Sequence, residues 1–169
     1  MQPRRQFLLA GGAGLATLAL LPLRSLYAAP AAASRPVTAY EVTHTEAEWR
    51  KLLTPDQFEV LRHSATERPF TSPFNNEHRA GRFACAGCRL EVFSSRTKFD
   101  SGTGWPSFWA PLERSVTASS DNSFGMLRSA ISCRRCGGHL GHVFDDGPKP
   151  TGLRYCMNGI AMTFTPGAA

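Results

Sequence analysis

One of the five cysteines, Cys156, has no partner in a C-x-x-C pair and stands among residues that could make it reactive. The segment 153–164 around it is rich in strand-forming residues, and side chains on a strand alternate between two faces. Arg154, Cys156 and Asn158 are therefore expected to share one face. A guanidinium beside a thiol favours the nucleophilic thiolate, and an amide can hydrogen-bond a bound oxygen. The pattern predicts a reactive cysteine; the alternative is a small buried apolar residue.

The other four cysteines form two C-x-x-C pairs at the ends of predicted strands. Cys85 and Cys88 enclose Ala-Gly, and Cys133 and Cys136 are followed by Gly-Gly. Two such pairs can place four thiolates tetrahedrally around Zn²⁺, so the sequence predicts a structural zinc site. The 44 residues between the pairs exceed the usual zinc-ribbon spacing. The alternatives are disulfides, which constrain little within a C-x-x-C, and a thioredoxin-like redox pair, which needs a βαβ pattern that we do not find.

The elements that must position these residues are short. Threonine-led capping boxes at 45–48 and 54–57 predict two helices. Downstream, Gly, Pro, Asp and Ser separate short apolar runs typical of strands, after an irregular covering loop. The helices are expected at 46–53 and 55–63, the loop at 68–76, and the strands at 81–84, 90–94, 115–119, 125–132, 139–144 and 153–164. The predicted fold class is mostly β, with short N-terminal helices.

The N-terminus differs in composition from the rest of the chain. Arg4 and Arg5 precede Phe-Leu, an uncharged apolar run to Leu23 with three glycines, and then Ala- and Pro-rich sequence. This order is similar to a bacterial twin-arginine export signal. A membrane anchor is the alternative, but the run from Phe7 to Leu23 is 17 residues long, below the roughly 20 that span a bilayer comfortably. We expect a cleaved signal over 1–33 and a periplasmic or otherwise exported protein.

Composition argues against a nucleic-acid partner. The net charge is +6, and three of the arginines lie within the first 33 residues, which contain no acidic residue. The remaining balance is only modestly basic, so no nucleic acid is implied. The length of 169 residues suits one folded domain with a real core.

Four blocks of sequence follow one another in a recognisable order. They are TKFDSGTGWPSF at 97–108, CRRCGG at 133–138, HLGHVFDDGP at 139–148 and GLRYCMN at 152–158. Over 45–164 the chain therefore resembles the B-type methionine-R-sulfoxide reductases, which return oxidised methionine to the thioether. The resemblance implies a zinc-stabilised, two-sheet, tent-like β-fold with Cys156 as the catalytic nucleophile. It divides the chain into the export signal at 1–33, a linker at 34–44 and a reductase domain at 45–165.

The resemblance also implies polar partners for the sulfoxide oxygen. His139 and His142 would hydrogen-bond or protonate it, a task that suits imidazole near neutral pH. Asn158 would orient the oxygen or a water molecule. The alternative for His139-x-x-His142 is metal binding, which lacks a third histidine or a carboxylate at ligand spacing.

Three further residues are implied around the thiol. The indole of Trp105, between Gly104 and Pro106, would contact the methyl group of the substrate; ordinary core packing is the alternative. Arg154 and Asp146 would tune the charge around the thiolate and fix the histidines. Asp146 also suits the turn that precedes Gly-Pro, which is its alternative explanation.

The chain departs from the family pattern at Thr103, where many relatives carry a resolving cysteine. The resemblance then implies a one-cysteine enzyme whose sulfenic acid is reduced by an external thiol, either a thioredoxin-fold protein or a small thiol. We expect oxidised proteins as substrates and a monomeric enzyme. The alternatives are a non-catalytic zinc-bound β-module that binds a partner, and a peroxide sensor that uses Cys156.

Overall fold

The computed structural model describes residues 40–122 and 128–169. These residues belong to one compact unit, Val37–Ala169. The export signal expected at 1–33 and most of the linker expected at 34–44 lie outside them. Within the described residues, no helix is long and apolar enough to cross a membrane.

Both expected helices are present. Helix α1 spans Glu46–Leu52, one residue shorter than expected, and helix α2 spans Pro55–His63. Thr45 and Thr54 cap them through complete capping boxes, in which Glu48 and Gln57 bond back to the cap residue. Helix α2 lies against β7 and carries buried apolar side chains toward the sheets.

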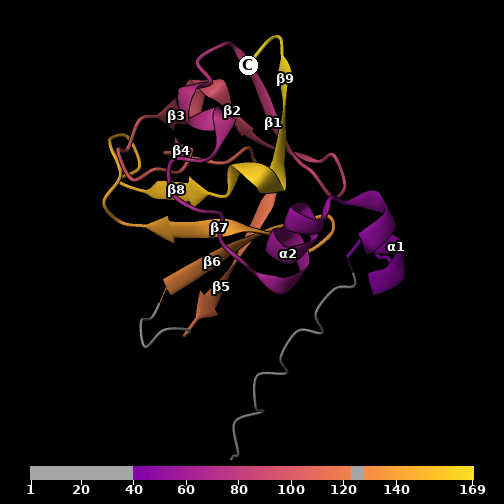
Figure 1. The fold of residues 1–169 in the computed structure, drawn as a ribbon. Helices are drawn as coiled ribbons and strands as arrows, with labels where there is room; N and C mark the ends of the chain where they lie inside the picture. The colour runs from indigo at the N-terminus through magenta and orange to yellow at the C-terminus, as the bar shows by residue number, and fades with distance from the viewer. Residues whose placement is uncertain (1–39, 123–127) are drawn as a thin grey trace, which may run out of the picture. The chain divides into compact units, whose positions relative to one another are not determined.

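Two antiparallel sheets make up the β part of the described chain (Figure 1). The smaller has the order β2–β1–β9, and the larger has the order β3–β4–β8–β7–β6–β5. Their strands are β1 (Gly81–Cys85), β2 (Glu91–Ser94), β3 (Lys98–Phe99), β4 (Ser107–Phe108), β5 (Val116–Asp121), β6 (Arg128–Cys133), β7 (His139–Phe144), β8 (Arg154–Met157) and β9 (Met162–Pro166). The expected mostly-β, two-sheet class is confirmed.

Aromatic rings join the two sheets. Phe83 of β1 and Phe93 of β2 are fully buried, and both contact Phe108 of β4, with ring centroids 5.0 Å and 4.4 Å from it. Leu140 of β7 and Met157 of β8 are also fully buried in this cluster. This packing holds the strand that carries Cys156 against a rigid core.

The prediction of one continuous strand over 153–164 is wrong. The chain leaves the larger sheet after Met157, forms a 3₁₀ helix at Gly159–Ala161, and enters the smaller sheet as β9. The Glu67 carboxylate accepts hydrogen bonds from the backbone N–H groups of Gly159 and Ile160, at 2.6 and 3.0 Å. Those two groups are thereby unavailable to a strand ladder, so the strand ends there.

Two strands were not expected from the sequence. β3 and β4 have two residues each and flank the turn-rich segment 100–106, so they are too short to show a periodic pattern. The strand expected at 125–132 is observed as Arg128–Cys133; residues 123–127 are outside the described part. The covering loop expected at 68–76 contains a 3₁₀ helix at Pro73–Asn76.

Candidate active site and metal centre

Cys156 lies in the middle of the larger sheet. It pairs directly with Ser107 of β4 on one side and with His142 of β7 on the other. Residues directly opposite each other in antiparallel strands project from the same face, so these three side chains form a row across the sheet. Arg154, two residues before Cys156 on β8, projects from that face as well. The sequence-based expectation that Arg154 and Cys156 share a face agrees with this register, whereas Asn158, the third residue of that expectation, lies beyond the end of β8 at the start of the 3₁₀ helix.

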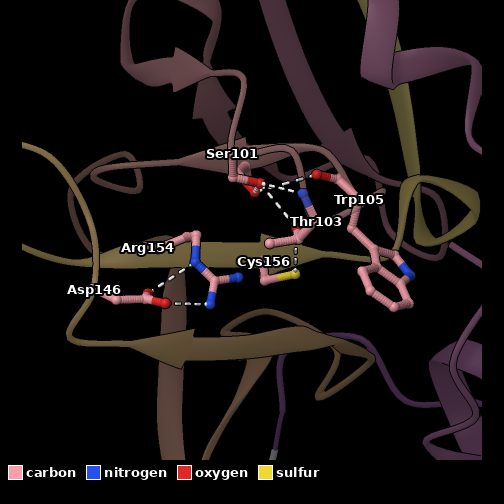
Figure 2. A network of polar contacts seen from close by, with 7 residues as sticks. Ser101, Thr103, Trp105, Asp146, Arg154 and Cys156 are labelled. Carbon is pink, nitrogen blue, oxygen red and sulfur yellow. Dashed lines mark hydrogen bonds and ion pairs between the residues drawn. The ribbon is translucent and has the colours of Figure 1, made fainter. Parts of the chain in front are cut away.

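A charged pair borders the thiol. The Arg154 guanidinium donates two hydrogen bonds of 2.8 Å to the Asp146 carboxylate (Figure 2). It also lies 4.5 Å from the centre of the Phe144 ring. Arg154 is largely buried, whereas Asp146 is exposed. The bidentate pair fixes the guanidinium beside Cys156 and lowers the pKa of the Asp146 carboxyl through the hydrogen bonds from Arg154.

Burial dominates the ionisation of Cys156. It raises the pKa of the thiol, while a hydrogen bond from Thr103 and the positive charge of Arg154 act in the opposite direction. The sequence correctly predicts that Arg154 favours the thiolate. It does not predict the burial that outweighs this effect, because burial depends on how the two sheets and the loop around Thr103 pack.

A chain of hydroxyl groups leads away from the thiol. The Thr103 Oγ1 atom is 3.9 Å from the Cys156 sulfur and 2.8 Å from the Ser101 Oγ atom. Ser101 in turn lies 2.7 Å from the Ser107 hydroxyl, which donates to the backbone carbonyl of Trp105. Figure 2 shows Ser101 and Thr103 of this chain above β8. The site therefore places a threonine hydroxyl in hydrogen-bonding reach of the sulfur.

Trp105 and Asn158 are both fixed through the backbone of Glu67. The indole N–H of Trp105 donates to the Glu67 carbonyl at 3.1 Å, and the Asn158 side-chain oxygen accepts from the Glu67 N–H at 3.0 Å. The Asn158 amide nitrogen donates to the Leu140 carbonyl at 3.2 Å. Asn158 is 3% exposed, and its amide thus ties three segments of backbone together. In Figure 2 the Cys156 sulfur points toward the side on which the Trp105 indole lies.

The two histidines have different surroundings. The His142 Nε2 atom is 2.8 Å from the Asp121 carboxylate, whose same oxygen lies 3.0 Å from the Arg128 guanidinium. His139 is 5% exposed, and within the described residues its Nε2 atom has no hydrogen-bond partner. Burial, followed by the charge on His142, lowers the pKa of His139 to about 4. His139 is therefore a neutral imidazole near pH 7.

Sequence reasoning missed two of the residues that build the site. Glu67 holds the end of β8 and the Trp105 indole, yet it lies between the expected helix at 55–63 and the expected loop at 68–76, where the sequence indicated no element. Asp121 is the carboxylate that contacts His142, whereas the hydrogen bonds of Asp146 go to Arg154. The feature that could have identified Asp121 is its position opposite Arg128 in the β5–β6 pair. That pairing depends on where the two strands begin and end, which the sequence does not define.

The four paired cysteines come together as expected. Their sulfur atoms all lie within 4.8 Å of one another, with Cys85 and Cys136 at 3.7 Å and Cys88 and Cys133 at 3.4 Å. These separations are far longer than the roughly 2.05 Å of a disulfide. Hydrogen bonds among the four thiols lower the pKa of Cys88 and Cys133 and raise the pKa of Cys85 and Cys136. The arrangement is that of a four-thiolate metal site.

Comparison with known proteins gives the family. The SelR domain model matches residues 53–166. A peptide methionine sulfoxide reductase MsrB from Agrobacterium fabrum is 51% identical over 131 residues, which cover 77% of this chain and 97% of the relative. The protein of the same name from Leptospira interrogans is 48% identical over 126 residues, which cover 74% of this chain and 96% of the relative. The chain therefore belongs to the SelR-domain family of MsrB peptide methionine sulfoxide reductases.

Proposed function

We propose that this protein reduces the R-sulfoxide of methionine, mainly in oxidised proteins, by nucleophilic attack of Cys156. The observation that carries the proposal is the row formed by Cys156 and His142 on paired strands, with Arg154 on the same face. A nucleophile, an imidazole and a fixed positive charge are the groups that attack on a polar S–O bond requires. Membership of the family supports the substrate.

The chemistry proceeds in two balanced steps. In the first, the Cys156 sulfur bonds to the sulfoxide sulfur, and the thiol proton passes by way of His142 to the sulfoxide oxygen. Transfer of that oxygen to the cysteine then releases the thioether, so the substrate gains two electrons and Cys156 becomes a sulfenic acid. The indole of Trp105 forms the apolar surface for the methyl group. Asn158 helps to hold that indole in place, because its side chain bonds to the backbone N–H of Glu67 and the indole bonds to the Glu67 carbonyl.

The second step needs electrons from outside the chain. Thr103 occupies the place beside Cys156 where many family members have a resolving cysteine, and its hydroxyl cannot form a disulfide. A thioredoxin-fold protein or a small thiol then supplies two thiols, which leave as a disulfide while the sulfenic oxygen leaves as water. The four paired cysteines take no part in this exchange, because they form the metal cluster.

Zinc fits the four-cysteine cluster. Tetrahedral Zn²⁺ with Zn–S bonds of about 2.3 Å places the sulfur atoms about 3.8 Å apart, close to the separations of the two nearest pairs. Cys85 ends β1 of the smaller sheet and Cys133 ends β6 of the larger sheet. The bound ion would supply a structural cross-link between the sheets, and the residues that hold it are Cys85, Cys88, Cys133 and Cys136.

Export by a twin-arginine-like signal is a separate proposal, supported by the composition of residues 1–33. The test is fractionation of bacterial cells that express the full chain and a variant with Arg4→Lys and Arg5→Lys. A shortened form in the periplasm that is lost in the double variant supports export. Retention of both proteins at full mass in the cytoplasm contradicts it.

The catalytic proposal is tested by turnover of separated R and S sulfoxides of a blocked methionine, with dithiothreitol as the reductant. We expect R-specific turnover in the wild type and none in Cys156→Ser, with one bound zinc in both proteins. Turnover by Cys156→Ser would contradict the mechanism. A Cys156 that forms sulfenic acid with peroxide but not with the sulfoxide would instead indicate a sensor, and no reaction with either would indicate a binding module.

A further inference from the structure

A carboxylate from two strands away contacts the imidazole beside the nucleophile. Asp121 is the last residue of β5, whereas His142 lies on β7, and β6 separates the two strands. The Asp121 Oδ2 atom is nevertheless 2.8 Å from the His142 Nε2 atom. Because His142 pairs directly with Cys156 across β7 and β8, the carboxylate is one residue removed from the reacting sulfur.

Arg128 holds the Asp121 carboxylate in place. The two residues face each other in the register of β5 and β6, and the guanidinium lies 3.0 Å from the same Oδ2 atom that contacts His142. Both side chains of this ion pair are about one-fifth exposed. An ion pair with little access to water restricts the carboxylate more strongly than an exposed pair would.

This contact decides which nitrogen of His142 carries hydrogen. A carboxylate only accepts hydrogen bonds, so the Nε2 atom must be protonated for the contact to be a hydrogen bond. In the neutral ring the Nδ1 atom is then the acceptor, and in the charged ring Nδ1–H is the free donor. The negative charge of Asp121 also stabilises a positive charge on the ring.

The remaining groups around His142 do not provide the same support. His139, on the same strand, is a neutral imidazole with its ring centre 5.3 Å away. His63, at the end of α2, lines the same cavity of about 480 Å³, but its Nδ1 atom contacts the exposed Glu59. Asp121 is thus the carboxylate that the structure places on the imidazole next to Cys156.

We propose that Asp121 is a positioning residue for the reduction: it fixes His142 as the Nε2–H tautomer and leaves Nδ1 to exchange protons with the thiol and the sulfoxide oxygen. The inference rests on the proposed function only for the role of His142 in proton transfer. While the Cys156–sulfur bond forms, His142 takes the thiol proton and gives a proton to the oxygen, so its charge is the same before and after the step. Asp121 stabilises the charged state in between.

The test compares three variants of the full chain, Asp121→Asn, Asp121→Glu and Glu59→Gln. Asparagine keeps the shape but can present an amide N–H to His142, which favours the other tautomer. Glu59→Gln removes the carboxylate of the exposed His63 pair and serves as the matched control. Turnover of the R-sulfoxide of blocked methionine gives kcat and KM, and ¹⁵N NMR of the histidine rings gives the tautomer of His142.

For Asp121→Asn we expect kcat to fall about 10- to 100-fold with KM within about twofold, since the lost interaction orients a proton-transfer group and does not bind substrate. Asp121→Glu should recover part of the rate, and Glu59→Gln should match the wild type. The wild-type His142 should be the Nε2–H tautomer. An unchanged kcat in Asp121→Asn, or a wild-type Nδ1–H tautomer, overturns the inference.

These outcomes separate this inference from the function it builds on. A wild type that turns over the sulfoxide, together with an equally active Asp121→Asn, contradicts only the role of Asp121. A wild type without turnover contradicts the proposed function, and the NMR tautomer then still decides whether Asp121 fixes the imidazole. The wild-type tautomer also decides the matter if Asp121→Asn does not fold.

Discussion

Replacing Asn158 by aspartate should make the stability of the protein depend on pH. Asn158 is 3% exposed, and its amide accepts from the Glu67 N–H and donates to the Leu140 carbonyl. Aspartate has nearly the same shape, so one carboxylate oxygen can still accept from Glu67. The other oxygen faces the Leu140 carbonyl, with which an ionised carboxylate has no favourable contact.

The size of the effect follows from these contacts. The variant loses one amide–carbonyl hydrogen bond, worth about 1 kcal/mol, and leaves a buried polar pair unmatched, which costs about 1–3 kcal/mol more. We therefore expect a loss of about 3 kcal/mol in the free energy of unfolding at pH 8. Since one pKa unit corresponds to about 1.4 kcal/mol, this loss corresponds to a carboxyl pKa in the folded variant near 6, about two units above that of unfolded aspartate.

The sign of the pH dependence is then fixed. A carboxyl with a raised pKa in the folded state contributes stability below its unfolded pKa and loses it as the pH rises through the folded pKa. The protonated aspartic acid can donate to the Leu140 carbonyl, as asparagine does. The difference between the wild type and Asn158→Asp should grow from about 1 kcal/mol at pH 4.5 to about 3 kcal/mol at pH 8.

Urea unfolding curves of the two proteins, recorded by tryptophan fluorescence between pH 4.5 and 8, measure this difference. Asn76→Asp, the same substitution on an exposed side chain, should stay within about 0.5 kcal/mol of the wild type at each pH. A gap for Asn158→Asp that does not change with pH, or that stays below about 1 kcal/mol at pH 8, would refute the reasoning from these contacts.

Three other predictions concern the thiol and the core. Thr103→Cys should form an intramolecular disulfide with Cys156 after one turnover, because the replaced oxygen lies 3.9 Å from the sulfur; continued trapping of sulfenic acid by dimedone at the wild-type level would contradict this. Arg154→Met should raise the pKa of Cys156 further, because the guanidinium lowers it, so alkylation by iodoacetamide at pH 8 should slow several-fold; an unchanged rate would mean that Arg154 does not act on the thiol. Phe108→Ala should cost about 3–5 kcal/mol in the free energy of unfolding, because the ring is fully buried between Phe83 and Phe93; a loss below about 1 kcal/mol in urea would count against the described core.

Local chemistry made some parts of this fold predictable. The capping boxes at Thr45 and Thr54 predict where both helices begin, because the residues that form such a box are close together in sequence. The two C-x-x-C pairs likewise specify their cluster, since two-residue spacing already brings two thiols to one side of a turn. Strand alternation placed Arg154 beside Cys156.

Contacts between distant segments account for the features that sequence reasoning missed. The end of β8 is set by the Glu67 carboxylate, 92 residues away from Gly159, and no local pattern indicates it. The contact of Asp121 with His142 depends on the exact register of three strands. The burial that raises the pKa of Cys156 depends on how the two sheets and their loops pack.

The hydroxyl chain beside Cys156 has a fixed number of hydrogens to share among its hydrogen bonds. Four links connect the sulfur, through Thr103, Ser101 and Ser107, to the Trp105 carbonyl, and each hydroxyl has one hydrogen to give. With Cys156 as a thiol, four hydrogens are present and every link can be filled. With a thiolate only three remain, and the sulfur is hydrogen-bonded only if Thr103 turns toward it. The Ser101 hydroxyl can then donate to Thr103, and the Ser107 hydroxyl can donate to Ser101. The hydrogen bond that is left without a hydrogen is then the one between Ser107 and the Trp105 carbonyl. The ionisation of the nucleophile is thus connected, through rotations of three hydroxyl groups, to the residue proposed to receive the methyl group of the substrate.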